Sequence, residues 1–345
     1  MDVEDAQRFL EALSDPALLA NVRREVVAVN GLAQSMFDAQ PNGRDLALSF
    51  RHPNVLAAVD RVLSGARTSE TVLEQTTPLQ RVFEVHIAAL SGEPNDNAFA
   101  LCILRDVTTA REAERMRADF VANVSHELRS PLTSLMGFIE TLKGPAKGDD
   151  DALARFLDIM DVEAGRMARL VDDLLSLSRV EAREHLPPND LVDPRQLLSD
   201  VVSTITPRAA ERGVPIRLEL GSGPVRVYGD RDELVEVFHN LIDNAVKYGR
   251  AGEAVSIRMT TDIRIPNIGG LGVSIATTNS GDLIAPEHRP RLTERFYRID
   301  KGRSRDVGGT GLGLAIVKHI VNRHRGQLVI ESTEETGNTF TVHLP

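Results

Sequence analysis

The chain has no tryptophan, and only 4% of its 345 residues are aromatic. It has a single cysteine, Cys102, so no disulfide can form within the chain, and a reducing compartment such as the cytoplasm is expected. It also lacks a run of ~18 apolar residues, the length that a membrane-spanning helix needs, and no signal peptide opens it. These absences predict a soluble, cytoplasmic protein.

Positive charge is also in the minority, with 40 Lys and Arg against 50 Asp and Glu and a net charge of −10. This balance argues against a nucleic-acid-binding surface over the whole molecule. A hydrophobic share of 42% is typical of a globular protein, and the length fits two or three domains.

Residues 120–139 predict one helix, because apolar residues recur at intervals of three and four and form one buried stripe: Phe120, Val124, Leu128, Pro131, Leu135 and Ile139. His126 is rotated about 200° from Leu128, so its ring is expected to face solvent. Glu127 could accept the Nδ1 proton and leave Nε2 free for nucleophilic attack. For an isolated dipeptide, the alternative is a plain polar surface pair.

The string "SHELRSPLT" (125–133) resembles the phosphoacceptor box of bacterial sensor histidine kinases, and "RMRADFVANVSHELRSPLTSLMGFIETL" is particularly similar to the phosphate-regulon sensors among them. The resemblance implies that His126 carries a phosphoryl group, that Glu127 orients its ring, and that Ser130 positions water for dephosphorylating a regulator. Relatives are often membrane-anchored, so the chain is expected to be a cytosolic sensor or to lack an anchor present in its natural form.

Two long helices are expected between residues 109 and 185. The first runs from Thr109 to about Thr141 and is stopped by glycines and a proline. The second begins after the acidic run 149–151 and continues to about Ala182, with a seam close to a heptad repeat: Leu153, Phe156, Met160, Ala164, Met167, Val171, Leu174 and Ser178. Two such stripes cannot be buried by the hairpin alone, and the resemblance implies a homodimer with a four-helix bundle.

Residues 1–108 contain strand-like alternation in "ETVLEQTTPLQRVFEVHIAALSG" and "NAFALCILRDVT", which predicts a β-hairpin with its turn at 91–96. This region resembles a PAS sensor domain that ends on Asp106, Val107 and Thr108. The alternative is an unrelated small α/β module. His52 and His86 are expected to be surface or hairpin histidines rather than haem ligands.

Residues 184–194 predict a linker. The third expected domain, 186–345, includes the end of this linker. It then alternates helices near 194–212, 230–248 and 311–324 with strands near 214–220, 224–228, 254–263, 271–277 and 327–344. The expected fold class is therefore multidomain α+β: a PAS-like α/β sensor, an antiparallel helical hairpin, and an α/β sandwich. The resemblance implies that this sandwich is a GHKL-type ATP-binding domain.

"HNLIDNAVKYG" places Asn240, Asn244 and Lys247 on one helix face, followed by Tyr248. Amide oxygens can ligate Mg²⁺, and a lysine can bind phosphate oxygens. By resemblance to the kinase N box, Asn244 holds Mg²⁺, Asn240 supports it and Lys247 contacts phosphate. A polar surface face is the alternative.

"GGTGLGLAIVKHI" (308–320) leads from a glycine loop into an amphipathic helix whose N-terminus can face an anion. It resembles a glycine box of the same kinases and supplies the expected ATP contacts Gly309, Thr310, Gly311, Leu312 and Gly313. Between the boxes, "LTERFYRIDKGRSRDVG" supplies Arg295 and Phe296 and is expected to form a lid over ATP, a solvated loop being the alternative.

One box departs from the family pattern D-x-G-x-G, because this chain has Asn279, Ser280, Gly281, Asp282 and Leu283. An amide in place of the carboxylate that accepts the adenine amino group is expected to lower affinity by ~1 to 2 kcal/mol. Leu283 is expected to conflict with a backbone that needs positive φ or comes close to the base.

The leading hypothesis is an ATP-dependent protein-histidine kinase that phosphorylates His126, with Mg²⁺, and transfers the phosphoryl group to an aspartate of a response regulator receiver domain. The alternative is a nucleotide-blind sensor scaffold or regulator phosphatase, motivated by Asn279 and Leu283. The signal, the identity of the regulator, and cis or trans phosphorylation within the dimer stay open.

Overall fold

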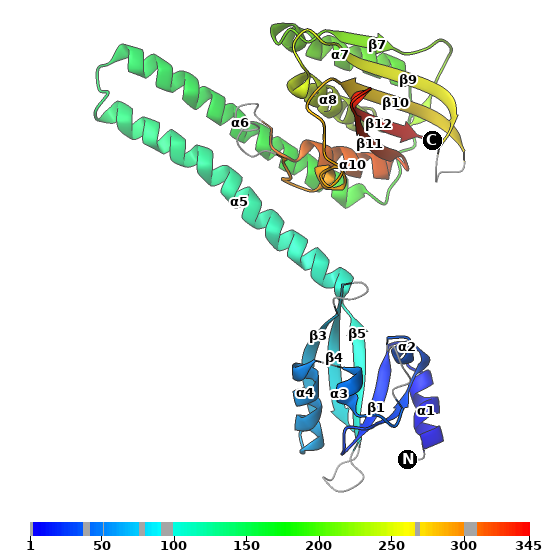
Figure 1. The fold of residues 1–345 in the computed structure, drawn as a ribbon. Helices are drawn as coiled ribbons and strands as arrows, with labels where there is room; N and C mark the ends of the chain where they lie inside the picture. Colours follow the sequence, from blue (N-terminus) through cyan, green and yellow to red (C-terminus); the bar gives the residue numbers. More distant parts are fainter. Residues whose placement is uncertain are drawn as a thin grey trace. The chain divides into compact units, whose positions relative to one another are not determined.

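The computed structural model describes residues 3–36, 42–50, 52–75, 80–90, 99–265, 270–299 and 309–345. The chain divides into two compact units, Met1–Ala122 and Asn123–Pro345, and most of their helices and strands are labelled in Figure 1.

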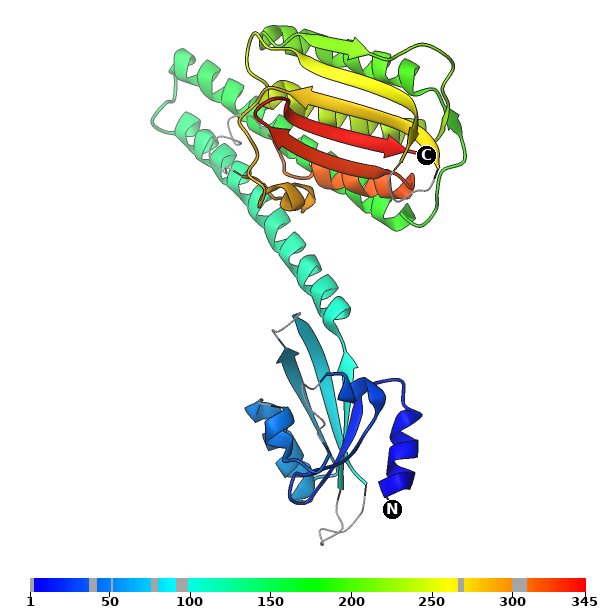
Figure 2. The ribbon, with the colours of Figure 1, turned by 45° about the vertical axis from the view of Figure 1, so that its right-hand side comes forward.

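The C-terminal unit contains the predicted α/β sandwich. Its five-stranded sheet has the order β11-β12-β10-β9-β7, and its strands are β7 (Ile216–Glu219), β9 (Val255–Arg264), β10 (Leu271–Asn279), β11 (Gln327–Thr333) and β12 (Gly337–Leu344). Only β7 and β9 pair in parallel among these described strands. Helices α7 (Pro194–Glu211), α8 (Arg231–Tyr248) and α10 (Gly313–Arg323) cover one face of the sheet, and η1 (Arg289–Thr293) is a short 3₁₀ helix (Figure 2).

The chain between the hairpin and α7 differs from the expected linker. Residues Leu191–Val192 form β6, which pairs with β8 (Val227–Tyr228) in a separate two-stranded sheet. A strand of two residues has too few positions to show an alternating pattern, so periodicity could not reveal it. Aspartates cap the N-termini of α7 and α8. The side chain of Asp193 accepts a hydrogen bond from Arg195 N, and that of Asp230 accepts from Asp232 N and Glu233 N.

The two long helices are confirmed as α5 (Thr108–Lys143) and α6 (Asp150–Arg183). Asp149 caps α6, since its carboxylate accepts from Ala152 N at 2.9 Å. The helix α5 continues through Pro131, which is buried. None of the described helices is long and apolar enough to cross a membrane.

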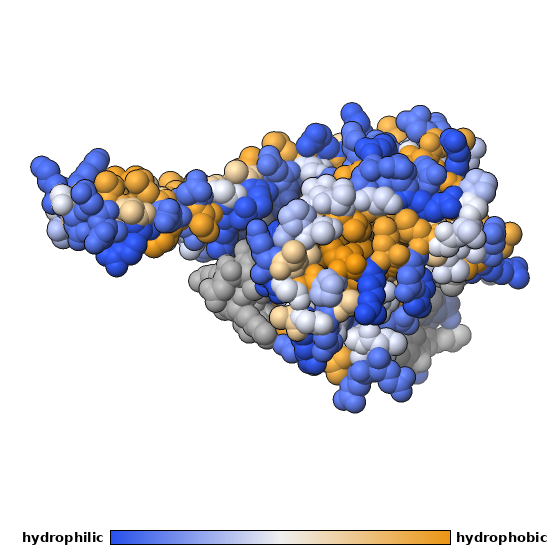
Figure 3. Space-filling view, turned by 90° about the horizontal axis from the view of Figure 1, so that it is seen from above, coloured by the Kyte–Doolittle hydropathy of each residue, from blue (hydrophilic) through white to orange (hydrophobic). Residues whose placement is uncertain are grey.

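The hairpin leaves apolar side chains uncovered in the single chain. Figure 3 shows orange patches along the arm that extends to the left. The exposed residues on α5 and α6 include Leu132, Met136, Leu153, Leu157, Val162 and Val171. Of the predicted seam, Phe156, Met160, Met167 and Leu174 are half-buried, while Leu153 and Val171 remain exposed.

The N-terminal unit is built on an antiparallel five-stranded sheet of order β2-β1-β5-β4-β3. Its strands are β1 (Ala17–Asn21), β2 (Val26–Val29), β3 (Thr68–Gln75), β4 (Arg81–Ala89) and β5 (Phe99–Asp106), and its helices are α1 (Val3–Glu11), α2 (Gly31–Gln34), α3 (Leu46–Ser49) and α4 (Pro53–Leu63). The predicted hairpin is present as β4 and β5, but the first of its two predicted arms contains two strands, β3 and β4, which pair with each other. The predicted turn at 91–96 lies outside the described residues.

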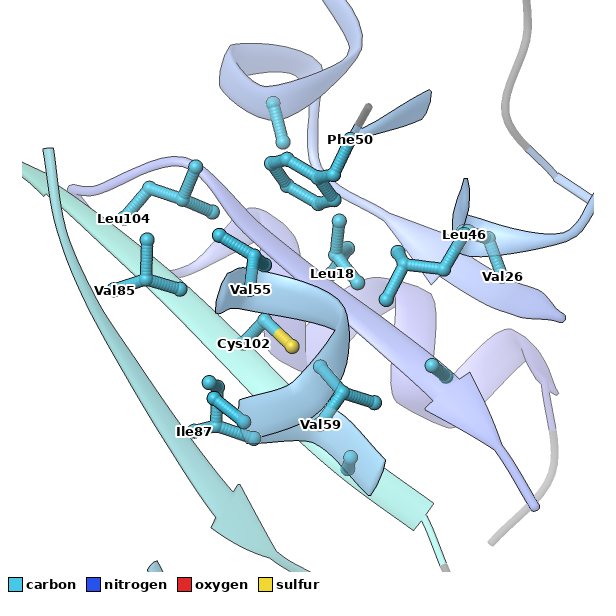
Figure 4. Close-up of a cluster of buried hydrophobic side chains, with 14 of the residues drawn as sticks. Leu18, Val26, Leu46, Phe50, Val55, Val59, Val85, Ile87, Cys102 and Leu104 are labelled. Atoms are coloured by element: carbon cyan, nitrogen blue, oxygen red, sulfur yellow. The ribbon is translucent and has the colours of Figure 1, made fainter. Parts of the chain in front are cut away.

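The main core of this unit lies between the sheet and the helices α2, α3 and α4 (Figure 4). Cys102 on β5 is fully buried there with Leu18, Val55 and Val59 around it, and burial raises the pKa of its thiol to about 12. Cys102 is thus a core thiol. His86 on β4 is half exposed and its Nδ1 lies 3.1 Å from Glu70 Oε1, as expected of a hairpin histidine.

Candidate active site

His126 lies on α5 with an exposed side chain, as the helical period predicts. Glu127, one position further round the helix, is half-buried and faces α6. Arg166 Nη2 donates to Glu127 Oε2 at 3.2 Å, and the two side chains are 17% and 30% exposed. The described contact of this carboxylate is therefore with α6, and the orientation of His126 by Glu127 stays a prediction. Local spacing could not indicate Arg166, which is 39 residues away.

Ser130 follows His126 by one helical turn and is also exposed. Its carbonyl accepts a hydrogen bond from the Ser134 hydroxyl at 3.3 Å. His126 and Ser130 therefore both lie on the solvent-exposed side of α5.

The expected N box lies on α8, whose apolar side faces the sheet and leaves Asn240, Asn244 and Lys247 half-buried. Asn240 lies against the start of α10: a Cβ on Gly313 would be 2.9 Å from Asn240 Oδ1. The structure thus brings together two motifs that are about 70 residues apart in the chain, as the resemblance implies.

Lys247 has an ion-pair partner that the motif did not indicate. Its Nζ lies 2.6 Å from Asp243 Oδ2, and Arg208 Nη1 donates to the other oxygen, Asp243 Oδ1, at 2.6 Å. The spacing of four residues between Asp243 and Lys247 on one helix was a signal for this pair. A lysine held in this way can still interact with phosphate through its remaining N–H groups.

The glycine loop is anchored by backbone geometry. Phe296 N donates to Gly311 O at 2.9 Å, and both residues have left-handed backbones, with φ of 63° and 78°. A Cβ on Gly311 would be 3.0 Å from the Phe296 Cα, so only glycine fits. Leu312 precedes α10 without offering a side-chain cap, and a helix N-terminus of this kind is suited to an anion.

The loop also contacts α6 through Thr310, whose hydroxyl donates to Asp173 Oδ2 at 2.6 Å. Burial raises the pKa of Asp173, although Thr310 and Lys247 act in the opposite direction. Arg295 Nη2 donates to Glu181 Oε1 at 2.5 Å, and Ser176 Oγ donates to Glu236 Oε1 at 2.6 Å. Sequence patterns gave no sign of these three contacts, because their partners are 60 to 137 residues apart.

The segment predicted to form a lid is held at its described end. The Tyr297 hydroxyl lies 2.7 Å from His288 Nδ1, and the Arg291 guanidinium lies over the Tyr297 ring at 4.3 Å. The charged part of the predicted lid, residues 300–308, lies outside the described residues.

The segment that departs from the family's D-x-G-x-G pattern, residues 279–283, begins at the last residue of β10. Asn279 is the last residue of this strand and is only 3% exposed. A Cβ on Gly281 would be 2.6 Å from Tyr248 O, which explains the glycine there. Leu283 does not have a positive φ and is 50% exposed, so its backbone conformation is one that a leucine can adopt. The expected conflict with a backbone that comes close to the base stays a prediction.

The residues around Asn244 fit a Mg²⁺ ion whose ligands are mainly the phosphates of the nucleotide and water. Among the described residues, no group of three or more His, Cys, Asp or Glu side chains could hold a metal ion. Mg²⁺ in phosphate-transfer sites usually has few protein ligands beside phosphates and water, and Asn244 can supply one amide oxygen.

Together, the fold and the site define a phosphotransfer enzyme with an ATPase-type sandwich and a helical hairpin that carries an exposed histidine. Residues 229–345 match the family described as "Histidine kinase-, DNA gyrase B-, and HSP90-like ATPase", and residues 116–183 match the "His Kinase A (phospho-acceptor) domain".

Known proteins agree with these matches. The chain is 42% identical to the phosphate regulon sensor protein PhoR of Pseudomonas aeruginosa, over 99% of this chain and 74% of PhoR. It is 39% identical to the sensor-like histidine kinase SenX3 of Mycolicibacterium smegmatis, over 73% of this chain and 63% of SenX3. The crystal structure of histidine kinase ThkA with response regulator protein TrrA has the same fold, with a TM-score of 0.51, 19% identity, and coverage of 98% of this chain and 97% of that one. The chain belongs to the sensor histidine kinases, which are ATP-dependent, autophosphorylating enzymes.

Proposed function

We propose that His126 is the phosphoacceptor of this kinase and that its phosphoryl group passes to an aspartate of a response regulator. Nε2 of His126 attacks the γ-phosphorus of ATP, the new N–P bond forms, and the bond to the bridging oxygen breaks with departure of ADP. The phosphoryl group then moves from the imidazole to the regulator's carboxylate. The observation that carries this proposal is the exposed ring of His126 on a helix whose neighbouring Glu127 is held by Arg166.

The C-terminal unit supplies the nucleotide site. Asn244 would hold Mg²⁺, with Asn240 in support, and the bound ion would neutralise charge on the phosphates. The glycine loop 309–313 would receive the phosphates, and Lys247 would add positive charge beside them. Tyr248, Asn279 and Gly281 would line the base, with Arg295 and Phe296 at the entrance.

A homodimer and a receiver domain are the proposed partners. The uncovered apolar residues of α5 and α6 support a four-helix bundle formed by two copies. ThkA is seen with a response regulator, which supports a similar partner here. Ser130 would position water when the kinase dephosphorylates its regulator.

The proposed division of the chain is a PAS-like sensor (1–108), the phosphoacceptor hairpin (109–185) and the catalytic domain (186–345). The strand order of the N-terminal sheet and the helices over one face support a PAS-like module. The similarity to PhoR, a phosphate regulon sensor protein, supports a role in phosphate regulation. The proposed location of the kinase reaction is the cytoplasm, because ATP and receiver domains are found there.

Incubation with γ-labelled ATP and Mg²⁺ tests the assignment of His126. Acid-labile, base-stable label is expected on the native chain and on His86→Ala, a change at an exposed histidine of the sensor sheet. No label is expected on His126→Ala. Label that survives His126→Ala would assign the phosphoryl group to another residue.

The nucleotide-blind scaffold is a second candidate because Asn279 replaces a carboxylate. Titration of a fluorescent ATP analogue separates the two candidates. Micromolar binding by the native chain excludes the scaffold, whereas binding that appears only in the double variant Asn279→Asp with Leu283→Gly would support it.

A further inference from the structure

Two buried polar atoms on β10 lack hydrogen-bond partners among the described residues: Asn279 Nδ2 and Thr277 Oγ1. The two residues are 3% and 0% exposed. Because alternate residues of a strand point to the same face, both side chains lie on the helix-covered face of β10, together with the core residues Val273 and Ile275. An unpaired buried N–H is unfavourable, so a ligand that supplies an acceptor at Asn279 would be stabilised.

The neighbouring amide is already satisfied. Asn338 lies directly opposite Asn279 in the β10–β12 register. Its Nδ2 donates to Asp282 O at 3.0 Å and its Oδ1 accepts from Ser332 Oγ at 2.6 Å. Asn338 therefore fixes the turn after β10, whereas Asn279 Nδ2 keeps an N–H donor that has no partner among the described residues.

The position of this donor is closely confined. A Cβ on Gly281 would lie 2.8 Å from Asn279 Nδ2, so the glycine makes room for the amide. Leu283, where the family pattern has glycine, is 50% exposed and is not part of the buried surroundings of the amide. The amide thus has a defined place at the end of β10.

The chemistry of an amide differs from that of the family's carboxylate. A carboxylate only accepts hydrogen bonds, whereas an amide both donates and accepts. The 6-amino group and N1 of adenine present a donor and an acceptor. The O6 and N1–H of a 6-oxopurine present the reverse order. An asparagine matches either edge when its amide group turns by 180°, while a carboxylate opposite O6 would bring two acceptors together.

We infer that Asn279 lets the base site accept 6-oxopurine nucleoside triphosphates as well as ATP, and this inference rests on the proposed ATP site. Inosine triphosphate is the matched probe, since it differs from ATP at the 6-position and in the protonation of N1, and it has no 2-amino group. Guanosine triphosphate adds that group and is therefore a less direct comparison.

Displacement of a fluorescent ATP analogue from the full chain by ATP and by ITP tests the inference. In the native chain the Kd for ITP is expected within about tenfold of the Kd for ATP. In Asn279→Asp the Kd for ITP divided by the Kd for ATP is expected to rise at least about tenfold, because the carboxylate has no N–H to donate to O6 of ITP. Asp282→Asn is the control: it changes charge at an exposed residue three positions away and is expected to leave the ratio unchanged.

The outcomes separate this inference from the proposed function. If ATP binds and labels His126 while ITP binds the native chain about a hundredfold more weakly, the inference is overturned and the kinase assignment stands. A ratio that is the same in the native chain and in Asn279→Asp also overturns it. If neither nucleotide binds, both fail. The native ratio needs no variant, so the test does not depend on the folding of Asn279→Asp.

Discussion

At the scale of single residues, the contact between Phe296 and Gly311 sets the shape of the glycine loop. Phe296 has a φ of 63°, which costs free energy for a residue with a side chain. Its backbone bond to Gly311 and the absence of a Cβ there allow the two segments to approach closely. The loop that would receive phosphates is therefore positioned by main-chain atoms.

Gly311→Ala is expected to lower the melting temperature by about 2 to 8 °C, since a left-handed alanine costs ~1–2 kcal/mol before the contact with Phe296 is counted. Weaker binding of an ATP analogue should accompany it. Gly309→Ala is the matched control, because its Cβ would meet nothing closer than the Tyr248 hydroxyl at 3.7 Å. Differential scanning fluorimetry of both variants measures the effect, and equal shifts would contradict this account.

His324 is a second residue whose environment gives a measurable consequence. It accepts from Asp230 N at Nε2 (3.0 Å), and its Nδ1 lies 2.8 Å from Ile320 O, so the neutral ring fits both partners. Burial lowers its pKa. The unfolded chain therefore binds this proton more readily, and the stabilisation is complete above the unfolded value of about 6.5 and is lost as pH falls towards the folded value.

Urea unfolding between pH 7.5 and 5.5 should accordingly show a falling free energy of unfolding in the native chain. His324→Gln, which cannot titrate, is expected to have a smaller slope over the same range, even if it is less stable overall. Parallel pH profiles for the two proteins would remove His324 as the cause.

At the scale of elements, α6 has two different sides. One side faces α5, where Phe156 stacks on Phe138, and the other presents Asp173, Ser176 and Glu181 to the sandwich. The contact between Asp173 and Thr310 puts a carboxylate 2.6 Å from a hydroxyl of the glycine loop. Because a carboxylate and a phosphate repel each other, this contact and a bound triphosphate oppose one another.

Asp173→Asn is expected to lower the Kd for an ATP analogue by about threefold to tenfold, since the amide keeps a hydrogen-bond acceptor and removes the charge. Asp172→Asn is the neighbouring control, and its side chain is exposed. Fluorescence titration of the two variants gives the comparison. An unchanged Kd in Asp173→Asn would show that the carboxylate does not oppose the nucleotide.

The elements differ in how far the sequence reveals them. The period of 3.6 residues located α5, α6, α7 and α8 within one or two residues of their observed ends, because each carries a long apolar stripe. The strands β3 and β4 were not separated, and β6 was missed, since pairing between strands rather than local pattern defines them. In the site, the sequence motifs predicted that Asn240 and Gly313 lie together, and the structure shows this contact. The roles of Arg166 and Asp173 could not be predicted, because their partners are distant in the sequence.

At the scale of the whole molecule, the exposed apolar residues of the hairpin predict self-association. Leu153 lies on the seam predicted from the sequence and is 42% exposed in the single chain. Burying such a seam against a second copy is the usual way to stabilise a pair of long helices.

Light scattering after gel filtration should therefore give the mass of two chains for the native protein. Leu153→Glu is expected to shift the mass towards one chain, because it would bury a charge in the seam. Leu186→Glu is the control, as Leu186 is 64% exposed and lies after α6. A native protein that elutes with the mass of a single chain at micromolar concentration would exclude the bundle.

The buried thiol of Cys102 makes the chain suitable for spectroscopy with site-specific spin labels or dyes. With its pKa raised to about 12 and its side chain inside the core of the N-terminal unit, this sulfur will not compete for maleimide or methanethiosulfonate reagents at neutral pH. A cysteine introduced on the surface of α5 or α6 becomes the sole labelling position, so spin labels or dyes can report separations between helices without first removing a native residue.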